Sequence, residues 1–327
     1  MTAVADEPQH DIRVPRASWA IAGRAHLACV LEASAPKPGN VSPGRPFADM
    51  RYEDFLVSAQ AIARPLEGAG RRPLGETILQ AVEATSSRTR ANTNLGMVLL
   101  LTPLARAGIQ RLDVPAAPER DQRLRALRTA VTGVLEETTV EDAENAYRAI
   151  RLANPGGLGN AEEQDVAAEP TVTLLEAMRL AADRDGIARE YASSYETTFD
   201  KGVPALLQAR ADGFSMSDAI VEAYLILLAG APDTHIARRG GDTLARHVSG
   251  LAAEALAAGG VRSDAGRLRI AAMDASLRDP RNLANPGTAA DLTAAAIFAA
   301  LIVGGWSMGP IDSAIAASQY EEGSEES

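Results

Sequence analysis

The sequence predicts an all-α protein that folds as a single compact multi-helix domain around one central buried helix. Apolar residues recur at the three- and four-residue spacing of helices, and no segment of useful length alternates with the period of two that marks strands. Hydrophobic residues make up 46% of the 327 residues, yet aromatic residues make up only 4%. Alanine, leucine and other short side chains must therefore fill the core, which favours closely packed helices over a sheet sandwich.

Each expected helix is defined by apolar spacing that runs between a capping signal and a Pro or Gly break. Thr139 with Asp142, and Thr288 with Asp291, are capping-box-like pairs in which Asp replaces the usual Glu. The run 223–229 is apolar on every face, so we expect it in the central, surrounded helix. In chain order, the expected helices cover residues 16–34, 51–66, 72–88, 94–108, 120–136, 140–153, 170–194, 201–229, 242–259, 262–278 and 289–306.

The two ends of the chain differ from its body. Residues 1–14 are predicted to be a loose N-terminal tail, residues 15–310 a single all-α catalytic domain, and residues 311–327 an acidic C-terminal tail. The first 14 residues contain acids and no apolar stretch, so no signal peptide is expected. Residues 292–311 carry no charge, but glycines and a proline interrupt them, which favours a buried helix over a membrane span.

Composition limits the partners that the chain is expected to have. The formal net charge is −11, from 43 acidic and 32 basic residues, and no long basic run occurs. Nucleic acid and an anionic membrane are therefore not expected as partners, which leaves small molecules and a possible homo-oligomer. The single cysteine, Cys29, excludes internal disulfides and a cysteine-based zinc site, and it predicts a reducing, cytoplasmic compartment.

The first stretch with a chemical signature is Pro36–Asn40, which Asp49 follows. Lys37 stands between two prolines, so its ammonium group is presented from a stiff, extended loop. Gly39 allows a tight turn and a close approach to a ligand, and Asn40 follows it. These residues fit a loop that holds a phosphate chain, and they fit equally well a helix-to-helix turn with capping residues.

Two further breaks carry polar or flexible residues. Asn92, Thr93 and Asn94 open a helix, where they either cap the helix or hydrogen bond to a nucleotide. The glycine-rich segment 154–159 makes a turn. It is not a P-loop, because no Gly-Lys-Ser/Thr follows, and it is not a dinucleotide fingerprint, because no strand precedes it.

Acidic residues point to a magnesium site. Asp183, Arg184 and Asp185 fall inside the expected helix 170–194, where Asp185 shares a face with the apolar Met178. An acid on an apolar face is costly unless it is paired or bound to a cation. Oxygen ligands of this kind suit Mg²⁺, which binds together with substrate phosphates.

Polar residues gather again near the end of the chain. Asp233 and His235 precede the pair Arg238–Arg239, and Asn285 precedes Asp291. A lone histidine is more often a surface or core residue than a ligand, and Asp291 fits a plain capping role. Together with Lys37, however, the two arginines can neutralise a polyphosphate. Taken by themselves, the residues predict a helical protein with a Mg-nucleotide site.

The same motifs also carry a resemblance. Pro-Lys-Pro-Gly, Asn-Thr-Asn at a helix start, Asp-Thr-His with Arg-Arg-Gly-Gly, and Asn-Pro-Gly-Thr-Ala-Ala-Asp-Leu occur in this order between about residues 20 and 306. The combination resembles the triphosphoribosyl-dephospho-CoA synthase family. The resemblance implies an all-α transferase in which the ribose 2′-hydroxyl of dephospho-CoA attacks the ribose C1 of ATP and adenine leaves. The product is a prosthetic-group precursor for an acyl carrier protein.

One departure marks the chain as a divergent member. The family looks to have Gly-Thr-Asn-Thr-His-Lys-Gly where this chain has residues 90–96, so a histidine and a lysine are replaced by Asn94 and Leu95. Two alternatives therefore stay open. One is a divergent enzyme that uses ATP in the biosynthesis of a pterin or furan one-carbon carrier, of the tetrahydromethanopterin or methanofuran type. The other is a non-catalytic helical nucleotide-binding or scaffold protein.

The expected site residues are carboxylates, bases and amides at helix starts and breaks. The reaction needs a carboxylate that takes the hydroxyl proton, charge compensation on the triphosphate, and hydrogen bonds to the departing adenine. The predicted catalytic residues are Asp49, Asp183, Asp185 and Asp233. The predicted Mg²⁺ ligands are Asp183, Asp185, Asp233 and Asp291. The predicted contacts to ATP are Lys37, Gly39, Asn40, Asn92, Thr93, Asn94, Arg184, His235, Arg238, Arg239 and Asn285.

Overall fold

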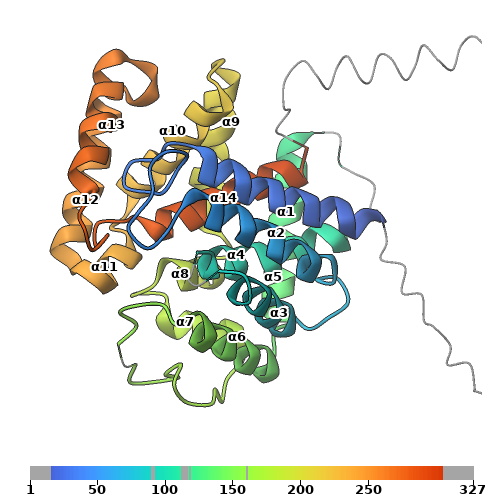
Figure 1. Ribbon diagram of the computed structural model, residues 1–327. Helices are drawn as coiled ribbons and strands as arrows, with labels where there is room; N and C mark the ends of the chain where they lie inside the picture. Colours follow the sequence, from blue (N-terminus) through green and yellow to red (C-terminus); the bar gives the residue numbers. More distant parts are fainter. Residues whose placement is uncertain (1–15, 90–92, 112–116, 118, 160, 305–327) are drawn as a thin grey trace, which may run out of the picture.

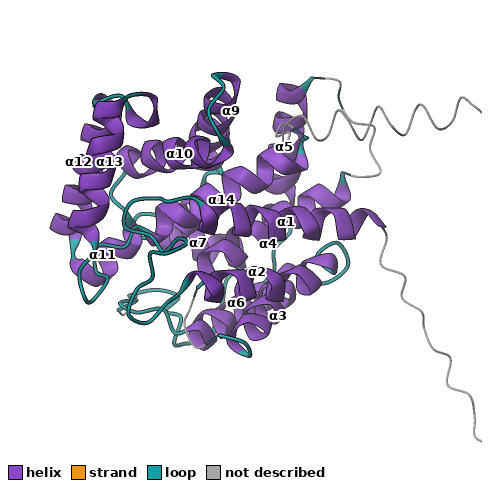
Figure 2. Ribbon diagram, turned by 45° about the horizontal axis from the view of Figure 1, so that its top comes forward, coloured by secondary structure: helices purple, strands orange, loops and turns teal. Residues whose placement is uncertain are grey.

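Every regular element of the described chain is helical. The computed structural model describes residues 16–89, 93–111, 117, 119–159 and 161–304. Figures 1 and 2 show helices and loops in this part and no strand; only an isolated bridge joins Ser42 and Arg45. The all-α prediction is therefore confirmed. The expected tails, residues 1–14 and 311–327, lie outside the described residues.

Most helices follow one another with short connections, whereas longer loops join α1 to α2 and α6 to α7. They are α1 (Arg16–Ser34), α2 (Tyr52–Glu67), α3 (Leu74–Ser86), α4 (Leu95–Gln110), α5 (Arg120–Glu136), α6 (Val140–Ala153), α7 (Leu174–Ala181), α8 (Gly186–Ala192), α9 (Val203–Ala211), α10 (Met216–Gly230), α11 (Thr234–Gly240), α12 (Asp242–Ala257), α13 (Asp264–Leu277) and α14 (Gly287–Ile302). A π-helical turn, Thr198–Gly202, precedes α9, and a 3₁₀ turn, Gly260–Arg262, precedes α13.

The core is built around α14, which lies in the middle of Figure 1 and packs against α1, α4 and α10. All residues from Ala294 to Ala300 are fully buried. The run 223–229 lies in α10, which is also buried from Ala219 to Leu225. The buried helix expected in the uncharged segment 292–311 is thus confirmed as far as Ile302, where α14 ends. Among the described helices, α14 rather than α10 has the most completely buried surface.

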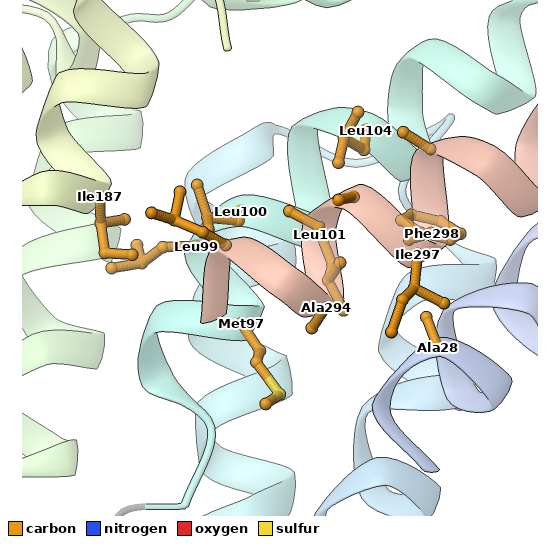
Figure 3. Packing of buried hydrophobic residues seen from close by; sticks show 14 of the residues in the cluster. Ala28, Met97, Leu99, Leu100, Leu101, Leu104, Ile187, Ala294, Ile297 and Phe298 are labelled. Atoms are coloured by element: carbon orange, nitrogen blue, oxygen red, sulfur yellow. The ribbon is translucent and has the colours of Figure 1, made fainter. Parts of the chain in front are cut away.

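Small side chains let these helices approach closely. In Figure 3, leucines of α4, among them Leu100 and Leu104, meet Ala294 and Phe298 of α14, while Ala28 of α1 lies on the other side. Burying a leucine or phenylalanine side chain stabilises a fold by roughly 1.5–3 kcal/mol. An alanine-rich central helix thus gains its stability from the larger side chains of its neighbours.

The prediction of two long continuous helices is wrong. The segment 170–194 is two helices, α7 and α8, because the chain leaves helical geometry at the turn before Asp185 and restarts with Asp185 as the N-cap of α8. The segment 201–229 is likewise divided into α9 and α10 around Gly213, whose φ of 86° is left-handed. The short helix α11 was not expected.

No single helix of the described chain has both the length and the apolar character of a membrane span. Only α10 and α11 taken together reach both, and they are bent by 60° at their junction.

Candidate active site

Three helix starts meet at one place. The Gly186 amide, which opens α8, donates to the Thr234 hydroxyl of α11 at 3.0 Å. That hydroxyl lies 3.0 Å from the hydroxyl of Thr288 in α14. A side chain at position 186 would come within 2.7 Å of Thr288 Cγ2, so the glycine permits this approach. The positive ends of three helix dipoles are thus neighbours, an arrangement that favours anions.

Asp233 joins two of these helices. Its Oδ1 accepts the amides of His235 and Ile236 at 2.9 and 3.1 Å, and its Oδ2 accepts the amide of Ala289 at 2.8 Å. Burial raises the pKa of its carboxyl group to about 6, although these hydrogen bonds act in the opposite direction. Both oxygens are already engaged, so the structure uses Asp233 to hold α11 against α14.

Asp185 has a different partner from the one expected. Its Oδ1 caps α8 by accepting the amides of Ile187 and Ala188, and its Oδ2 lies 2.6 Å from the Arg238 guanidinium. The interpretation of Asp185 as a mid-helix acid that shares a cation with Asp183 is therefore wrong, because Asp185 stands at a helix start and is paired with arginine. Asp183 and its neighbour Arg184 are exposed in the preceding turn.

The guanidinium group of Arg238 has only part of its hydrogen-bonding capacity satisfied within the described residues. One terminal nitrogen donates to Asp185, whereas its buried Nε has no hydrogen-bond partner among the described residues. A buried N–H group without an acceptor is costly and marks a place that a ligand can complete.

Asp291 is the carboxylate at this site that the protein leaves without a partner. No described N–H or O–H group hydrogen bonds to it, and it packs directly against Gly96 at the start of α4. Burial raises its pKa well above the ordinary value, the charges of Glu32 and Asp233 raise it further, and Arg238 acts in the opposite direction. A carboxyl group in this environment is suited to accept a proton or a cation.

Lys37 does not face this region with a free ammonium group. Its Nζ lies 2.9 Å from Glu32 Oε1, donates to the carbonyl oxygen of Glu32, and lies 3.3 Å from the carbonyl oxygen of Ala35. Lys37 is 1% exposed and Glu32 is 2% exposed. All three ammonium hydrogens have acceptors within the protein, so the expected phosphate contact of Lys37 is wrong for this conformation.

The loop after Lys37 is tied to the segment before α14. Asn40 donates to the side-chain oxygen of Asn285 at 2.7 Å, and the Asn40 side-chain oxygen is buried without a partner. Gly39 has a φ of 78°, as its predicted tight turn requires, but its amide donates to Asp274. Asn40 and Asn285, far apart in sequence, are thus brought together, whereas Gly39 is engaged within the protein.

The residues at the start of α4 mostly bind the protein itself. Thr93 and Ser58 share a short hydroxyl hydrogen bond. Asn94 donates to Thr85 Oγ1 at 3.2 Å and does not cap α4 with its side chain. Asn92 lies outside the described residues. Asp49 is exposed at the rim and accepts a hydrogen bond from Asn282.

His235 packs against Gly287 and lies close to two arginines. Arg239 lies 3.5 Å from its Nε2 and donates its other hydrogens to the carbonyl oxygens of Arg281 and Asn282. Burial lowers the pKa of His235 to about 4, and the charges of Arg238 and Arg239 contribute. The imidazole is therefore neutral at pH 7 and can hydrogen bond to a ligand.

We expect the ring protons of His235 to titrate near pH 4 in NMR spectra, and not near 6.5. The folded state then binds fewer protons than the unfolded state between these values. Stability contributed by this group is complete above about pH 6.5 and is lost as the pH falls towards 4. His235→Gln should remove that part of the pH dependence in thermal melts. A midpoint near 6.5 would contradict the burial argument.

Sequence reasoning missed two acids. Glu32 lies on the buried face of α1, where it follows Ala25 and Ala28 at helical spacing. Asp274 accepts hydrogen bonds from Gly39 and Arg278. For Glu32, the sequence did contain a signal, because an acid at helical spacing from apolar residues indicates a buried acid. For Asp274, no local feature of the sequence indicates a special role.

The predicted set of four Mg²⁺ ligands is not assembled. Within the described ranges, no three His, Cys, Asp or Glu side chains come together as a metal site. Asp183 is exposed and apart, and the oxygens of Asp185 and Asp233 already have partners. Asp291 remains as the carboxylate that can accept a cation.

The family of the chain follows from a match that covers most of its length. A family model described as ATP:dephospho-CoA triphosphoribosyl transferase matches residues 18–309. The chain belongs to this family. The match includes every site residue described above and confirms the resemblance seen in the motifs.

Individual relatives of this triphosphoribosyl transferase family match shorter parts. The 2-(5''-triphosphoribosyl)-3'-dephosphocoenzyme-A synthase of Klebsiella pneumoniae is 36% identical over 102 residues, which are 31% of this chain and 36% of the relative. A probable synthase of the same name from Stutzerimonas stutzeri (strain A1501) is 37% identical over 113 residues, 34% of this chain and 38% of the relative. These matches thus span little more than a third of each curated relative.

A solved structure extends the similarity to the fold. A protein of Archaeoglobus fulgidus, described as a candidate triphosphoribosyl-dephospho-CoA synthase, is 28% identical with a TM-score of 0.58. The alignment covers 77% of this chain and 100% of that one.

Proposed function

We propose that the chain transfers the triphosphoribosyl group of ATP to the ribose 2′-hydroxyl of dephospho-CoA, with release of adenine. Family membership over residues 18–309 supports the reaction class. The observation that carries the proposal is the meeting of three helix starts beside Arg238, whose buried Nε has no acceptor, and Asp291, which has no partner. Anion-binding and cation-binding groups side by side fit a Mg-triphosphate.

Each side chain has a definite part in this proposal. Arg238 holds phosphate oxygens through its unpartnered Nε, the positive ends of the three helix dipoles favour the negative charge, and the side-chain oxygen of Asn40 accepts a hydrogen bond from a ribose hydroxyl. His235 stays neutral and therefore acts as a hydrogen-bond partner and not as an acid. Asp185 keeps Arg238 oriented through the 2.6 Å ion pair. Cleavage of the glycosidic bond passes through an oxocarbenium-like state, which nearby negative charge stabilises.

Mg²⁺ fits this donor set as a partner of the nucleotide and not as an ion enclosed by the protein. Asp291 is the residue that would hold it, because the remaining acids have their oxygens engaged. One or two carboxylates together with phosphates and waters are the usual environment of Mg²⁺. The ion would supply charge neutralisation at the triphosphate.

The test is to incubate the purified chain with Mg-ATP and dephospho-CoA and to separate the products by chromatography. We expect adenine that accumulates only when the acceptor is present. Arg238→Gln should lower the rate by about a hundredfold, the scale of one preorganised electrostatic contact. ADP or AMP in place of adenine would reject the proposal and indicate a phosphoryl transferase or a ligase.

The acceptor is the less constrained half of the proposal, since the curated relatives match about a third of the chain. The second candidate keeps the ATP site and joins it to a precursor of a pterin or furan one-carbon carrier. Adenine release with such an acceptor, and none with dephospho-CoA, would favour it. If Mg-ATP is titrated into the chain and calorimetry detects no binding, the result would instead indicate a scaffold protein.

A further inference from the structure

A cavity lies away from the candidate active site. It has a volume of about 340 Å³ and shares no residue with the site described above. It lies between the turn that joins α2 to α3, the second half of α4, and the turn that joins α5 to α6. Its lining comprises Arg71, Arg72, Pro73, Leu74, Arg106, Val134, Glu137, Thr138, Thr139, Glu141 and Asp142.

Two of the lining arginines are positioned by main-chain acceptors. Arg72 donates to the carbonyl oxygen of Pro65 at 2.6 Å, and Arg106 donates to the carbonyl oxygen of Arg72 at 3.0 Å. Gly68 makes the first contact possible, because a side chain there would occupy the space of the Arg72 guanidinium. Both guanidinium groups are thus oriented by neutral acceptors.

Neither arginine has its charge compensated within the described chain. Arg72 and Arg106 form no ion pair, and the Nε of Arg72 is buried without any hydrogen-bond partner. A guanidinium group held with unused donors is suited to a planar or tetrahedral oxyanion.

The acids around the cavity do not supply that acceptor. Asp142 receives the amides of Gly75 and Thr139 at 2.7 and 2.9 Å, so both its oxygens are engaged. Glu137 and Glu141 are exposed and form no ion pair with the arginines. Their charge at the rim disfavours a polyanion such as a nucleoside triphosphate and tolerates a ligand with one anionic group.

We propose that this cavity binds a small oxyanion ligand that carries one carboxylate or phosphate group, held by Arg72 and Arg106. A volume of about 340 Å³ lies at the lower end of the range for ligand pockets, which suits a small metabolite. Arg106 lies in α4, the helix whose first turn contacts Asp291 through Gly96. A ligand here would therefore bind to the same helix that borders the candidate active site.

The test is calorimetric titration of the intact chain with inorganic phosphate and, separately, with acetate, which carries one carboxylate. We expect binding that weakens tenfold or more in Arg72→Gln and in Arg106→Gln, since each removes a charged donor. The probe that binds more tightly identifies the anionic group. Arg125→Gln is the matched control, because Arg125 is exposed on α5 outside the cavity.

Binding at the nucleotide site must be separated from binding at this cavity. The Arg238→Gln variant loses a contact of the nucleotide site and keeps Arg72 and Arg106, so it should still bind phosphate in the cavity. Loss of all phosphate binding in Arg238→Gln with full retention in Arg72→Gln would overturn the proposal. The same holds if neither probe binds at millimolar concentration, or if Arg125→Gln weakens binding equally. Should Arg72→Gln fail to fold, Arg106→Gln decides the question, because the Arg106 side chain donates one hydrogen bond among the described residues, to the carbonyl oxygen of Arg72.

Discussion

Lys37→Ala is expected to lower the free energy of unfolding by about 3–5 kcal/mol, the usual effect of removing one partner from a buried ion pair. Lys37 and Glu32 are both almost fully buried, and their charged atoms lie 2.9 Å apart. Without the ammonium group, the Glu32 carboxylate would remain in the core with no counter-charge. Urea denaturation of the variant and of the unmodified chain at pH 7 measures the difference.

The pH dependence of this loss has a definite sign. Burial raises the pKa of Glu32, and Lys37 acts in the opposite direction. Removing Lys37 therefore raises the folded-state pKa of Glu32 further. A group with a raised folded-state pKa contributes stability below its unfolded value that is lost as the pH rises. The deficit of Lys37→Ala should consequently be smaller at pH 5 than at pH 8.

A double variant provides the control. Glu32→Leu combined with Lys37→Met replaces the ion pair by apolar side chains of similar size, which is often nearly neutral for stability. It should therefore recover most of the loss. If Lys37→Ala instead keeps its full stability and loses affinity for Mg-ATP, then Lys37 contacts phosphate, as the sequence alone suggested.

The sequence predicted those helices whose limits are set locally. The bounds 16–34, 120–136 and 140–153 agree with α1, α5 and α6. The last of these begins at a capping box, Thr139 with Asp142, that can be recognised without any tertiary contact. The local sequence contains everything needed to start such a helix.

The break before α8 could not be found in the same way. Residues 181–185 contain two alanines and charged residues that are compatible with a helix. Asp185 caps α8 locally, and the turn is held in addition by its pairing with Arg238 and by the Gly186 amide, which donates to Thr234. Both partners lie about fifty residues further along the chain, beyond the reach of a window of sequence. The seven-residue helix α11 is fixed by the same contacts.

The sequence indicated which types of residue form the candidate site, but it did not indicate which of these residues contact one another. Asn40 with Asn285, and Asp185 with Arg238, were each named as site residues and do meet. The partner of Lys37 was not anticipated, because Glu32 lies within the preceding helix and not in the loop. Glu32 and Lys37 lie close together in the sequence, but this closeness alone does not predict that they form a buried ion pair.

Asp291→Asn is expected to lose most of its turnover while the protein remains folded. The carboxyl group has no described partner, and burial together with the charges of Glu32 and Asp233 raises its pKa. An amide of the same shape removes an unfavourable charge, so the free energy of unfolding without ligand should be unchanged or higher. The stability that this group contributes in the unmodified chain is present below its unfolded pKa, about 3.9, and is lost as the pH rises. The variant should therefore gain relative to the unmodified chain above about pH 4.

The same substitution removes the one carboxylate that is available to Mg²⁺ in the described site. We expect the stabilisation by Mg-ATP in thermal melts to disappear and adenine release to fall by about a hundredfold or more, the scale of losing a positioned catalytic or metal-binding group. Asp121→Asn, which alters an exposed acid at the start of α5, is the matched control and should change neither quantity.

The two measurements together also decide what Asp291 binds. If Mg-ATP still stabilises Asp291→Asn fully while adenine release is lost, the carboxylate receives the proton of the attacking hydroxyl and is not a Mg²⁺ ligand. If both persist, Asp291 is a structural acid of α14 and the proposed site is incorrect. If the variant is strongly destabilised without ligand, the carboxyl group has a partner that compensates its burial, and the argument from its isolation fails.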